Sequence, residues 1–153
     1  MLDLTLNGSG DSLHAGIEAV AGLCRHSGFD EDRIDEVATA LGEALTNAWQ
    51  YGNSRRDELH IGLKAFRAQD SVIVEVKDSG NGFDVIPPFP DLAKKLAGEE
   101  RPTGWGVFLM RVLASEVSFF TERGGMHRVR MRFDRARPAE PAPIQISRGE
   151  SVP

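Results

Sequence analysis

Glu43 and Asn47 are the first side chains in this sequence whose types and spacing could support chemistry. They lie four residues apart in a segment of helical periodicity, so they share one side of a helix, nearly opposite its apolar stripe. An amide oxygen can bind Mg²⁺ while a neighbouring carboxylate orients or deprotonates a nucleophile. A solvated polar helix face contains the same residue types, so the pair does not decide the function by itself.

Asp78 is a second candidate because it continues the alternation of the three valines in the strand before it. Its carboxylate is therefore expected on the core side, where charged groups are rarely buried without a partner. Two roles remain open: the carboxylate binds backbone donors of the next turn, or it accepts a hydrogen bond from a ligand. Gly80 and Gly82 follow at once, and they either form a turn or let the backbone approach a bound molecule.

The third candidate is the pair Gly104 and Gly106, which stands where a helix is expected to begin. Free backbone N–H groups and the helix dipole at such a position attract phosphate groups. A tight turn would also explain these glycines. No third glycine follows at the Rossmann spacing, and the Walker lysine and hydroxyl are absent.

Alternating and helical patterns predict the elements that must position these residues. One helix begins after Asp11 or Ser12 and ends near His26, and a second is capped by Asp30 and stops at residues 52–54. Strands are predicted over residues Leu2–Leu6, 58–66, 71–78, 117–121 and 126–133, with a third long helix over residues 107–114. This order favours an α+β domain with its helices on one face of a mixed, mostly antiparallel sheet.

Two irregular regions complete the expected organisation. Residues 79–103 are rich in glycine and proline, with one short helix expected over residues 91–96, and such a long connection is typical of a functional lid or binding loop. The composition changes after Asp134, where four prolines occur without an apolar period. We therefore expect a domain over residues 1–134 and a mobile proline-rich tail over residues 135–153.

Composition limits the classes of function. A chain of 153 residues suggests one domain, and its single cysteine, Cys24, excludes an internal disulfide and a site with several thiolate ligands. The net charge of −5 makes a broad nucleic-acid-binding surface improbable. Neither an apolar run long enough for a membrane span nor a secretory signal pattern is present, so we expect a cytoplasmic protein without membrane or nucleic-acid partners.

Taken in order, the three motifs resemble the N, G1 and G2 boxes of the GHKL ATPase superfamily. They are Glu43-x-x-x-Asn47, Asp78-x-Gly80-x-Gly82 and Gly104-x-Gly106. The stretches over residues 40–48 and 104–111 look specifically like those of the anti-sigma-factor serine kinases. The resemblance covers residues 4–133 and implies a Bergerat-type two-layer α/β sandwich that binds ATP and Mg²⁺ between its helices and loops.

The resemblance also implies a role for each residue of these motifs. Asn47 would coordinate Mg²⁺, and Glu43 would act as the base toward a serine hydroxyl of a partner protein. Asp78 would accept a hydrogen bond from the adenine amino group. The glycines would let the loops close on the base (Gly80, Gly82) and lie along the phosphates (Gly104, Gly106). Many relatives carry Thr or Ser near the start of the last strand, where this sequence has His127 and Arg128.

The function implied is an ATP-dependent protein serine kinase that acts as an anti-sigma regulator. Such a protein would sequester a sigma factor or another regulator, phosphorylate a STAS-type anti-anti-sigma protein, and form a homodimer. The alternative is a non-catalytic ATP-binding module that switches partners without phosphate transfer. Glu43 favours the kinase, because ATP binding alone does not require a base at that position.

Overall fold

The computed structural model describes residues 1–79, 105–122 and 126–148. Within this part of the chain, three α-helices and a short π-helix accompany a sheet of six strands. The elements in order are β1 (Leu2–Leu6), α1 (Gly10–His26), α2 (Glu31–Asn47), η1 (Ala48–Gly52), β2 (Ile61–Ala68), β3 (Ser71–Lys77), α4 (Trp105–Leu113), β4 (Glu116–Thr121), β5 (His127–Asp134) and β6 (Ile144–Arg148). The expected helix over residues 91–96 and the expected lid lie outside the described residues.

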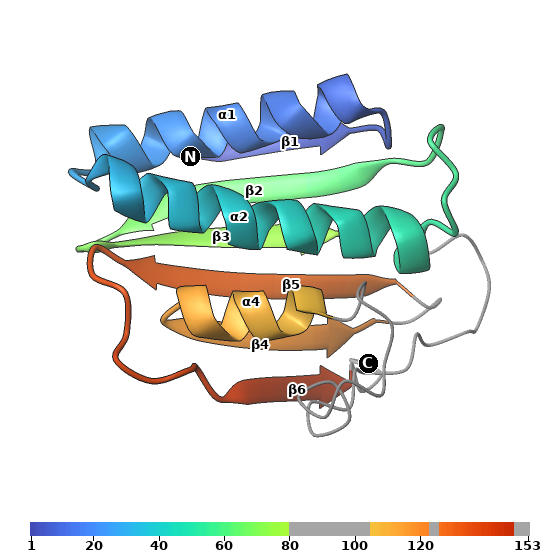
Figure 1. The fold of residues 1–153 in the computed structure, drawn as a ribbon. Helices are drawn as coiled ribbons and strands as arrows, with labels where there is room; N and C mark the ends of the chain where they lie inside the picture. Colours follow the sequence, from blue (N-terminus) through green and yellow to red (C-terminus); the bar gives the residue numbers. More distant parts are fainter. Residues whose placement is uncertain (80–104, 123–125, 149–153) are drawn as a thin grey trace.

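The sheet is mixed, with the strand order β1-β2-β3-β5-β4-β6 (Figure 1). Every neighbouring pair is antiparallel except β4 and β6, which run parallel. The two expected hairpins are present: β2 pairs with β3 and β4 with β5. Strand β5 therefore lies next to β3, although the two strands are far apart in the sequence.

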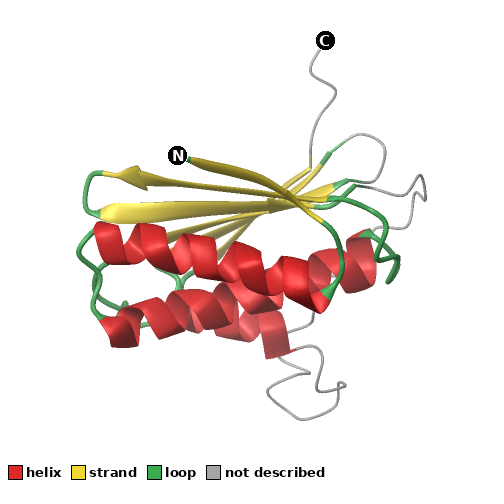
Figure 2. Ribbon diagram, turned by 90° about the horizontal axis from the view of Figure 1, so that it is seen from above, coloured by secondary structure: helices red, strands yellow, loops and turns green. Residues whose placement is uncertain are grey.

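All three α-helices cover the same face of the sheet, and the view along the layers separates them clearly (Figure 2). The core lies between the two layers, because alternate residues of the central strands point toward the helices. Its largest fully buried members are Phe133, Leu41, Leu45, Ile61, Leu63, Met110, Met131, Val20, Val37, Val72, Val74 and Val76. The expected two-layer α+β architecture is confirmed.

Local sequence signals explain where the two long helices begin. The Asp30 side chain accepts a hydrogen bond from the backbone N–H of Arg33 at 2.8 Å, which caps α2 as the sequence predicts. Helix α1 begins slightly earlier than expected, because Ser9 rather than Asp11 or Ser12 provides the cap. These caps satisfy N–H groups that have no partner within the helix.

The helix-free face of the sheet carries paired charges. Glu75 on β3 contacts both Arg128 and Arg130 on the neighbouring strand, and Arg132 contacts Glu116 at 3.1 Å. Arg128 also lies over the ring of Phe120, 4.3 Å from its centroid. The alternation of arginine with apolar residues in β5 therefore places the apolar residues in the core and the arginines on this face.

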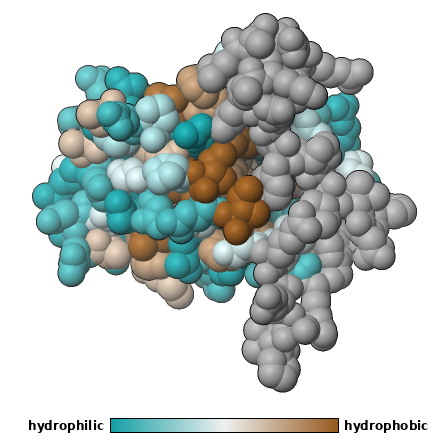
Figure 3. All heavy atoms as spheres, turned by 90° about the horizontal axis from the view of Figure 1, so that it is seen from below, coloured by the Kyte–Doolittle hydropathy of each residue, from teal (hydrophilic) through white to brown (hydrophobic). Residues whose placement is uncertain are grey.

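Residues 144–148 were expected to belong to the mobile tail over residues 135–153. In the structure they form the strand β6 along the edge of β4. Ala142 precedes this strand and is buried, and its backbone N–H donates to the carbonyl of Arg111 at 2.7 Å. Ile146 is exposed, and Figure 3, which looks at the molecule from this side, shows apolar side chains gathered in the middle of the view. No helix among the described residues is long and apolar enough to cross a membrane.

Candidate functional site

Glu43 and Asn47 lie on the side of α2 that faces α4, where both side chains are half-buried. Helix α4 packs against α2 through Gly106. A Cβ atom placed on Gly106 would lie 2.8 Å from Glu43 Oε2 and 3.6 Å from Asn47 Nδ2. The structure therefore brings together the first motif and the second glycine of the third motif, and a larger residue at position 106 would displace the Glu43 carboxylate.

The polar side of α2 is thus covered, which helical periodicity alone does not predict. Only the absence of a side chain at Gly106 leaves room for the carboxylate beside the first turn of α4. Backbone N–H groups in the first turn of a helix are free to bind an anion, and the helix dipole favours negative charge there. The site therefore combines a carboxylate, an amide and a helix N-terminal turn.

The second helix does not stop at residue 52 as a simple α-helix but ends in the π-helix η1. The backbone N–H of Asn53 bonds to the carbonyl of Ala48 at 2.8 Å, and that of Arg55 bonds to Trp49 at the same distance. Ser54 and Arg55 then adopt positive φ angles of 50° and 61°, which end the helix. Single π-turns of this kind occur often at functional sites.

The π-helix delivers Gly52 to the carboxylate of Asp78. A Cβ atom on Gly52 would lie 2.0 Å from Asp78 Oδ2, so only glycine fits between η1 and the end of β3. Gly52 is five residues beyond Asn47 in continuous helix, a separation of about 7 Å at the usual rise. Asp78 therefore lies beside the continuation of the helix that carries Glu43 and Asn47, although 30 residues separate Asp78 from Ala48 in the sequence.

Asp78 is buried on the core side of the sheet, as the alternation of β3 predicts. Its Oδ1 accepts a hydrogen bond from the backbone N–H of His127 at 3.1 Å, and its Oδ2 lies 3.1 Å from His127 Nδ1. This backbone donor comes from the first residue of β5. A carboxylate has about four lone-pair positions, so it can accept further hydrogen bonds.

The segment after Asp78 is anchored by the buried Asn53. Asn53 Oδ1 accepts from the backbone N–H of Ser79 at 2.9 Å, and its Nδ2 donates to the carbonyl of His60 at 3.0 Å. The Ser79 hydroxyl also donates to the His60 carbonyl. The end of η1, the start of β2 and the end of β3 are therefore connected directly beside Asp78.

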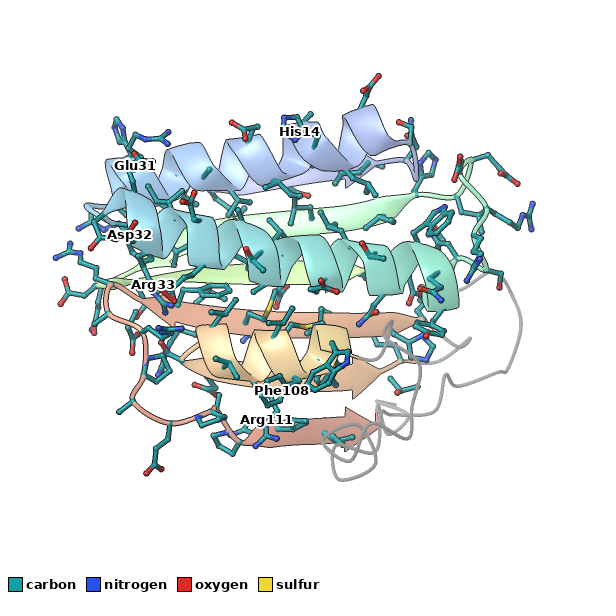
Figure 4. The ribbon with its side chains drawn as sticks, viewed as in Figure 1. His14, Glu31, Asp32, Arg33, Phe108 and Arg111 are labelled. Carbon is teal, nitrogen blue, oxygen red and sulfur yellow. The ribbon has the colours of Figure 1, made fainter. Side chains whose placement is uncertain are left out.

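Arg33 holds the opposite end of α4. Its side chain is 2% exposed, and it donates to the carbonyl of Leu113 at 2.6 Å and to that of Asp134 at 2.8 Å. Figure 4 shows Arg33 on the first turn of α2, beside the end of β5. Burial lowers the pKa of this guanidinium below its usual value, against the opposing effect of Glu36.

Arg111 makes a similar connection on the outer side of α4. Its Nε donates to the carbonyl of Ala142 at 2.8 Å, and Figure 4 shows its side chain lying next to β6. Arg33 and Arg111 thus attach α4 to the sheet away from Gly106. These contacts fix the helix whose first turn lies beside Glu43.

The remaining predicted glycines, Gly80, Gly82 and Gly104, lie outside the described residues. Gly52 was expected only to end a helix, and His127 was notable in the sequence only as a departure from relatives. Glycine at the end of a helix usually signals termination, so nothing in the local pattern indicated that Gly52 contacts a carboxylate. The contact of His127 with Asp78 depends on the pairing of β3 with β5, which local sequence does not encode.

Comparisons with known proteins identify the family of the chain. The family model described as "Histidine kinase-like ATPase domain" matches residues 9–133. The protein named "Serine-protein kinase RsbW" from Listeria monocytogenes serotype 4a is 24% identical over 127 residues, covering 80% of this chain and 81% of its own length. The protein of the same name from Bacillus velezensis is 28% identical over 111 residues, covering 69% of this chain and 68% of its own.

Two further proteins extend the comparison. The protein named "Anti-sigma F factor" from Clostridium botulinum is 26% identical over 101 residues, which cover 66% of this chain and 71% of its own. Among solved structures, the SiaB–SiaC complex from Pseudomonas aeruginosa contains a chain of similar fold. It aligns with a TM-score of 0.54 and 16% identity over 87% of this chain and 89% of that one. Because the family model matches most of this sequence, the chain belongs to the histidine kinase-like ATPase domain family.

Proposed function

We propose that this protein is an ATP-dependent protein serine kinase of the anti-sigma type. The observation that carries the proposal is the packing of Gly106, in the first turn of α4, against the Glu43 carboxylate with Asn47 beside it. The chain belongs to a family of ATPase domains. A relative that matches this chain over 81% of its own length is named a serine-protein kinase. ATP is therefore the phosphoryl donor.

Asn47 is the magnesium-binding residue in this proposal. Mg²⁺ prefers oxygen ligands, and in phosphoryl-transfer sites it takes most of them from water and phosphate oxygens. One amide beside a helix N-terminal turn fits that requirement, because the turn attracts the phosphates that complete the coordination. In this proposal Gly104 would lie along the same phosphates, and Gly80 and Gly82 would let the loop close on the base.

Glu43 is the general base. The serine hydroxyl of the partner attacks the γ-phosphorus, the bond from that phosphorus to the bridging oxygen breaks, and ADP leaves. Glu43 accepts the proton that the serine loses. Phosphoryl transfer depends mainly on positioning and charge stabilisation, so one carboxylate is sufficient for the proton transfer.

Asp78 accepts a hydrogen bond from the amino group of adenine. Its burial at the end of β3, on the core side of the sheet, supports this role. The adenine would then lie beside Gly52, on the continuation of the helix that carries Asn47.

The partners are two proteins. The relatives' names, "Serine-protein kinase RsbW" and "Anti-sigma F factor", support a sigma factor or another regulator and a protein phosphorylated on serine as the partners. Following the sequence resemblance, we propose that the first is sequestered and that the second is a STAS-type anti-anti-sigma protein. We further propose that the chain works as a cytoplasmic homodimer. Sedimentation of the purified protein tests the dimer, and incubation with labelled ATP, Mg²⁺ and STAS proteins from the same genome tests the substrate.

The substitution Glu43→Gln separates the kinase from a nucleotide-dependent partner switch. A general base contributes about 10²–10⁴-fold, so phosphorylation of the partner should fall by that factor. The amide keeps the shape of the side chain, so Mg-ATP affinity should change by less than about tenfold. Phosphate transfer and ATP binding are measured on the same preparation.

Two variants of neighbouring residues complete this experiment. Asn47→Ala should weaken Mg-ATP binding itself, whereas Thr46→Ala, at an exposed position of the same helix, should leave binding unchanged. If the wild-type protein binds ATP but phosphorylates none of the STAS proteins that it binds, the kinase proposal is wrong and the partner-switch alternative takes its place. Wild-type transfer rates in Glu43→Gln would remove Glu43 from the mechanism.

A further inference from the structure

The outer side of α4 and the strand β6 form an exposed apolar surface. Among the described residues four large apolar side chains are exposed, and two of them, Trp105 and Ile146, belong to these two elements. Trp105 packs edge to face on Phe108, with the ring centroids 5.5 Å apart, and Figure 4 shows Phe108 on the side of α4 nearest β6. We call Trp105, Phe108, Ile144 and Ile146 the α4–β6 surface.

Strand register places Ile146 on the helix side of the sheet. Ile146 lies opposite Phe119 on β4, and Phe119 lies opposite the core residue Val129 on β5. Directly paired residues point to the same face, so Ile146 continues a row of core residues by one strand. It is nevertheless 52% exposed. Figure 1 shows why: α1 lies over the opposite edge strand β1, whereas no described helix lies over β6.

Strand β6 also has a free edge. It is the last strand in the order of the sheet, so its outer backbone groups have no strand partner within the described part of the chain. Natural edge strands are often protected by proline, lysine or a bulge. Residues 144–147 contain neither proline nor lysine, and their pairing with β4 is continuous. A free edge beside an apolar row can accept an extended peptide as an additional strand.

The charge of the surface indicates which kind of peptide fits it. Helix α4 and strand β6 contain two arginines and no acidic residue, although the whole chain has a net charge of −5. Arg111 is half-buried and its Nε donates to the carbonyl of Ala142, but it forms no ion pair with a described residue. An acidic side chain from another protein would supply the counter-charge where water is excluded, and the attraction is stronger there.

The α4–β6 surface reaches the proposed active site at one end. Trp105 directly precedes Gly106, the residue that faces the Glu43 carboxylate. Strand β6 runs parallel to β4, toward the end of the sheet where His127 contacts Asp78. A protein held along β6 therefore lies next to the group that accepts the proton of its serine in the proposed reaction.

We propose that the α4–β6 surface docks the protein that receives the phosphate, through an extended segment with apolar residues and an acidic residue. The segment pairs with the free edge of β6 as a seventh strand, its apolar side chains cover Ile146 and Phe108, and its carboxylate faces Arg111. The inference rests on the proposed kinase function and adds how the substrate protein is selected. Strand β6 lies beyond residues 9–133, which the family model matches, so the contact uses a part of this chain outside the shared domain.

Two substitutions of Ile146 test the apolar and the charged part of this contact. Ile146→Asp and Ile146→Lys remove the same side chain but introduce opposite charges. Both should raise the KM for a STAS protein that the wild type phosphorylates by about threefold to tenfold, the effect of losing one partly exposed isoleucine. Ile146→Asp should raise it by about a further threefold, because aspartate repels an acidic segment and lysine attracts it. Mg-ATP affinity, measured on the same preparations, should not change.

Ser147→Asp and Ser147→Lys are the matched controls. Ser147 is exposed on the same strand but lies opposite Phe120, on the helix-free face of the sheet. Both variants should leave the KM for the STAS protein within about twofold of the wild type, as expected for an exposed charge without a partner. A wild-type KM in both Ile146 variants, or a larger defect in Ile146→Lys than in Ile146→Asp, would overturn this inference.

Hydrogen exchange in the wild-type protein avoids any effect of substitution on folding. Addition of the same STAS protein should slow exchange at those amides of residues 144–147 that point away from β4, because they gain a strand partner. Unchanged exchange at these amides would also overturn the inference.

Two further outcomes separate this inference from its alternatives. A different mass of Ile146→Asp in sedimentation, compared with the wild type, would assign the surface to a second copy of this chain and overturn docking of the substrate. A wild-type protein that phosphorylates none of the STAS proteins would instead overturn the proposed function.

Discussion

Gly52 lies so close to the Asp78 carboxylate that a single methyl group cannot be added there. The Cβ of Gly52→Ala would lie 2.0 Å from Oδ2, and Asp78 cannot move away because His127 holds both of its oxygens. We expect this variant to lose about 1–3 kcal/mol in the free energy of unfolding and to bind ATP more weakly. Urea denaturation and calorimetry measure the two effects.

The control for Gly52 is Gly22 in α1, where an added Cβ has no neighbour within 4 Å. Gly22→Ala should be stabilising by about 0.5–1 kcal/mol, because alanine has the higher helix propensity. If Gly52→Ala matched this control in stability and ATP affinity, the contact with Asp78 would have no energetic importance.

Gly106 represents a different kind of constraint, because the atom it approaches can move. The Cβ of Gly106→Ala would meet the flexible end of Glu43, 2.8 Å away, and a gain in helix propensity opposes the cost of moving that side chain. We therefore expect stability to change by less than about 1 kcal/mol while phosphate transfer falls by roughly 10², as for a misplaced catalytic group. Thermal unfolding and a transfer assay on one sample separate these effects, and unaltered transfer would contradict the placement of Glu43.

Individual residues of the site were predictable where one element carries the signal. Glu43 and Asn47 are neighbours on one helix, and Asp78 continues the alternation of one strand, so spacing placed each on the correct side. The contacts of Gly52 and Gly106 join separate elements and could not be derived from periodicity. The same is true of Asp78 and His127, whose contact follows from the pairing of β3 with β5.

At the scale of elements, Arg33 connects α2 to the end of α4 and to the end of β5. Replacing it with Met removes the donors for two carbonyl groups, those of Leu113 and Asp134. We expect Arg33→Met to lower the free energy of unfolding by about 2–4 kcal/mol, because hydrogen bonds from a charged group are stronger than neutral ones. Chemical denaturation measures the loss.

Arg137 provides the comparison for Arg33, since both contact the carboxylate of Glu36. Arg137 is about half exposed and lies 3.4 Å from Glu36 Oε2, whereas Arg33 is buried. Exposed ion pairs contribute little, so Arg137→Ala should cost only about 0–1 kcal/mol. Similar losses in the two variants would show that the backbone contacts of Arg33 are unimportant.

The α-helices and most strands were predictable to within a few residues, because the spacing of apolar residues and the capping residues indicate the same elements. The π-helix was not, because an additional residue in a helical turn leaves no mark on an apolar pattern of this length. Strand β6 was also missed, since only Ile144 and Ile146 alternate in it and its pairing with β4 is not local. Proline-rich composition before the strand indicated a tail, and the structure shows that a short edge strand can follow such a segment.

At the scale of the whole molecule, β6 protects the edge of the sheet. A chain that ends at Asp134 would lose this strand together with the two hydrogen bonds between Arg111 and Ala142. We expect its melting temperature to fall by roughly 4–8 °C, the shift for about 2 kcal/mol in a chain of this size. Exposed edge strands also pair between molecules, so self-association should increase.

Calorimetry and light scattering during gel filtration measure these two changes. The control is a chain that ends at Arg148, which keeps β6 complete and should behave like the full sequence. A truncated chain with wild-type stability and wild-type mass would show that β6 is dispensable and that residues 1–134 form the whole structural unit.

The parallel pairing of β4 with β6 also sets the order in which the protein can be completed during its synthesis. Strand β4 can pair with β5 soon after both have been made, but its other edge must wait until all 27 residues from 122 to 148 have been added. At ordinary rates of translation this interval lasts about 1–5 s, which is long compared with the formation of a hairpin. During that time the edge of β4 in the nascent chain is unpaired. Strand β6 covers this edge only after the proposed ATP-binding face has been assembled.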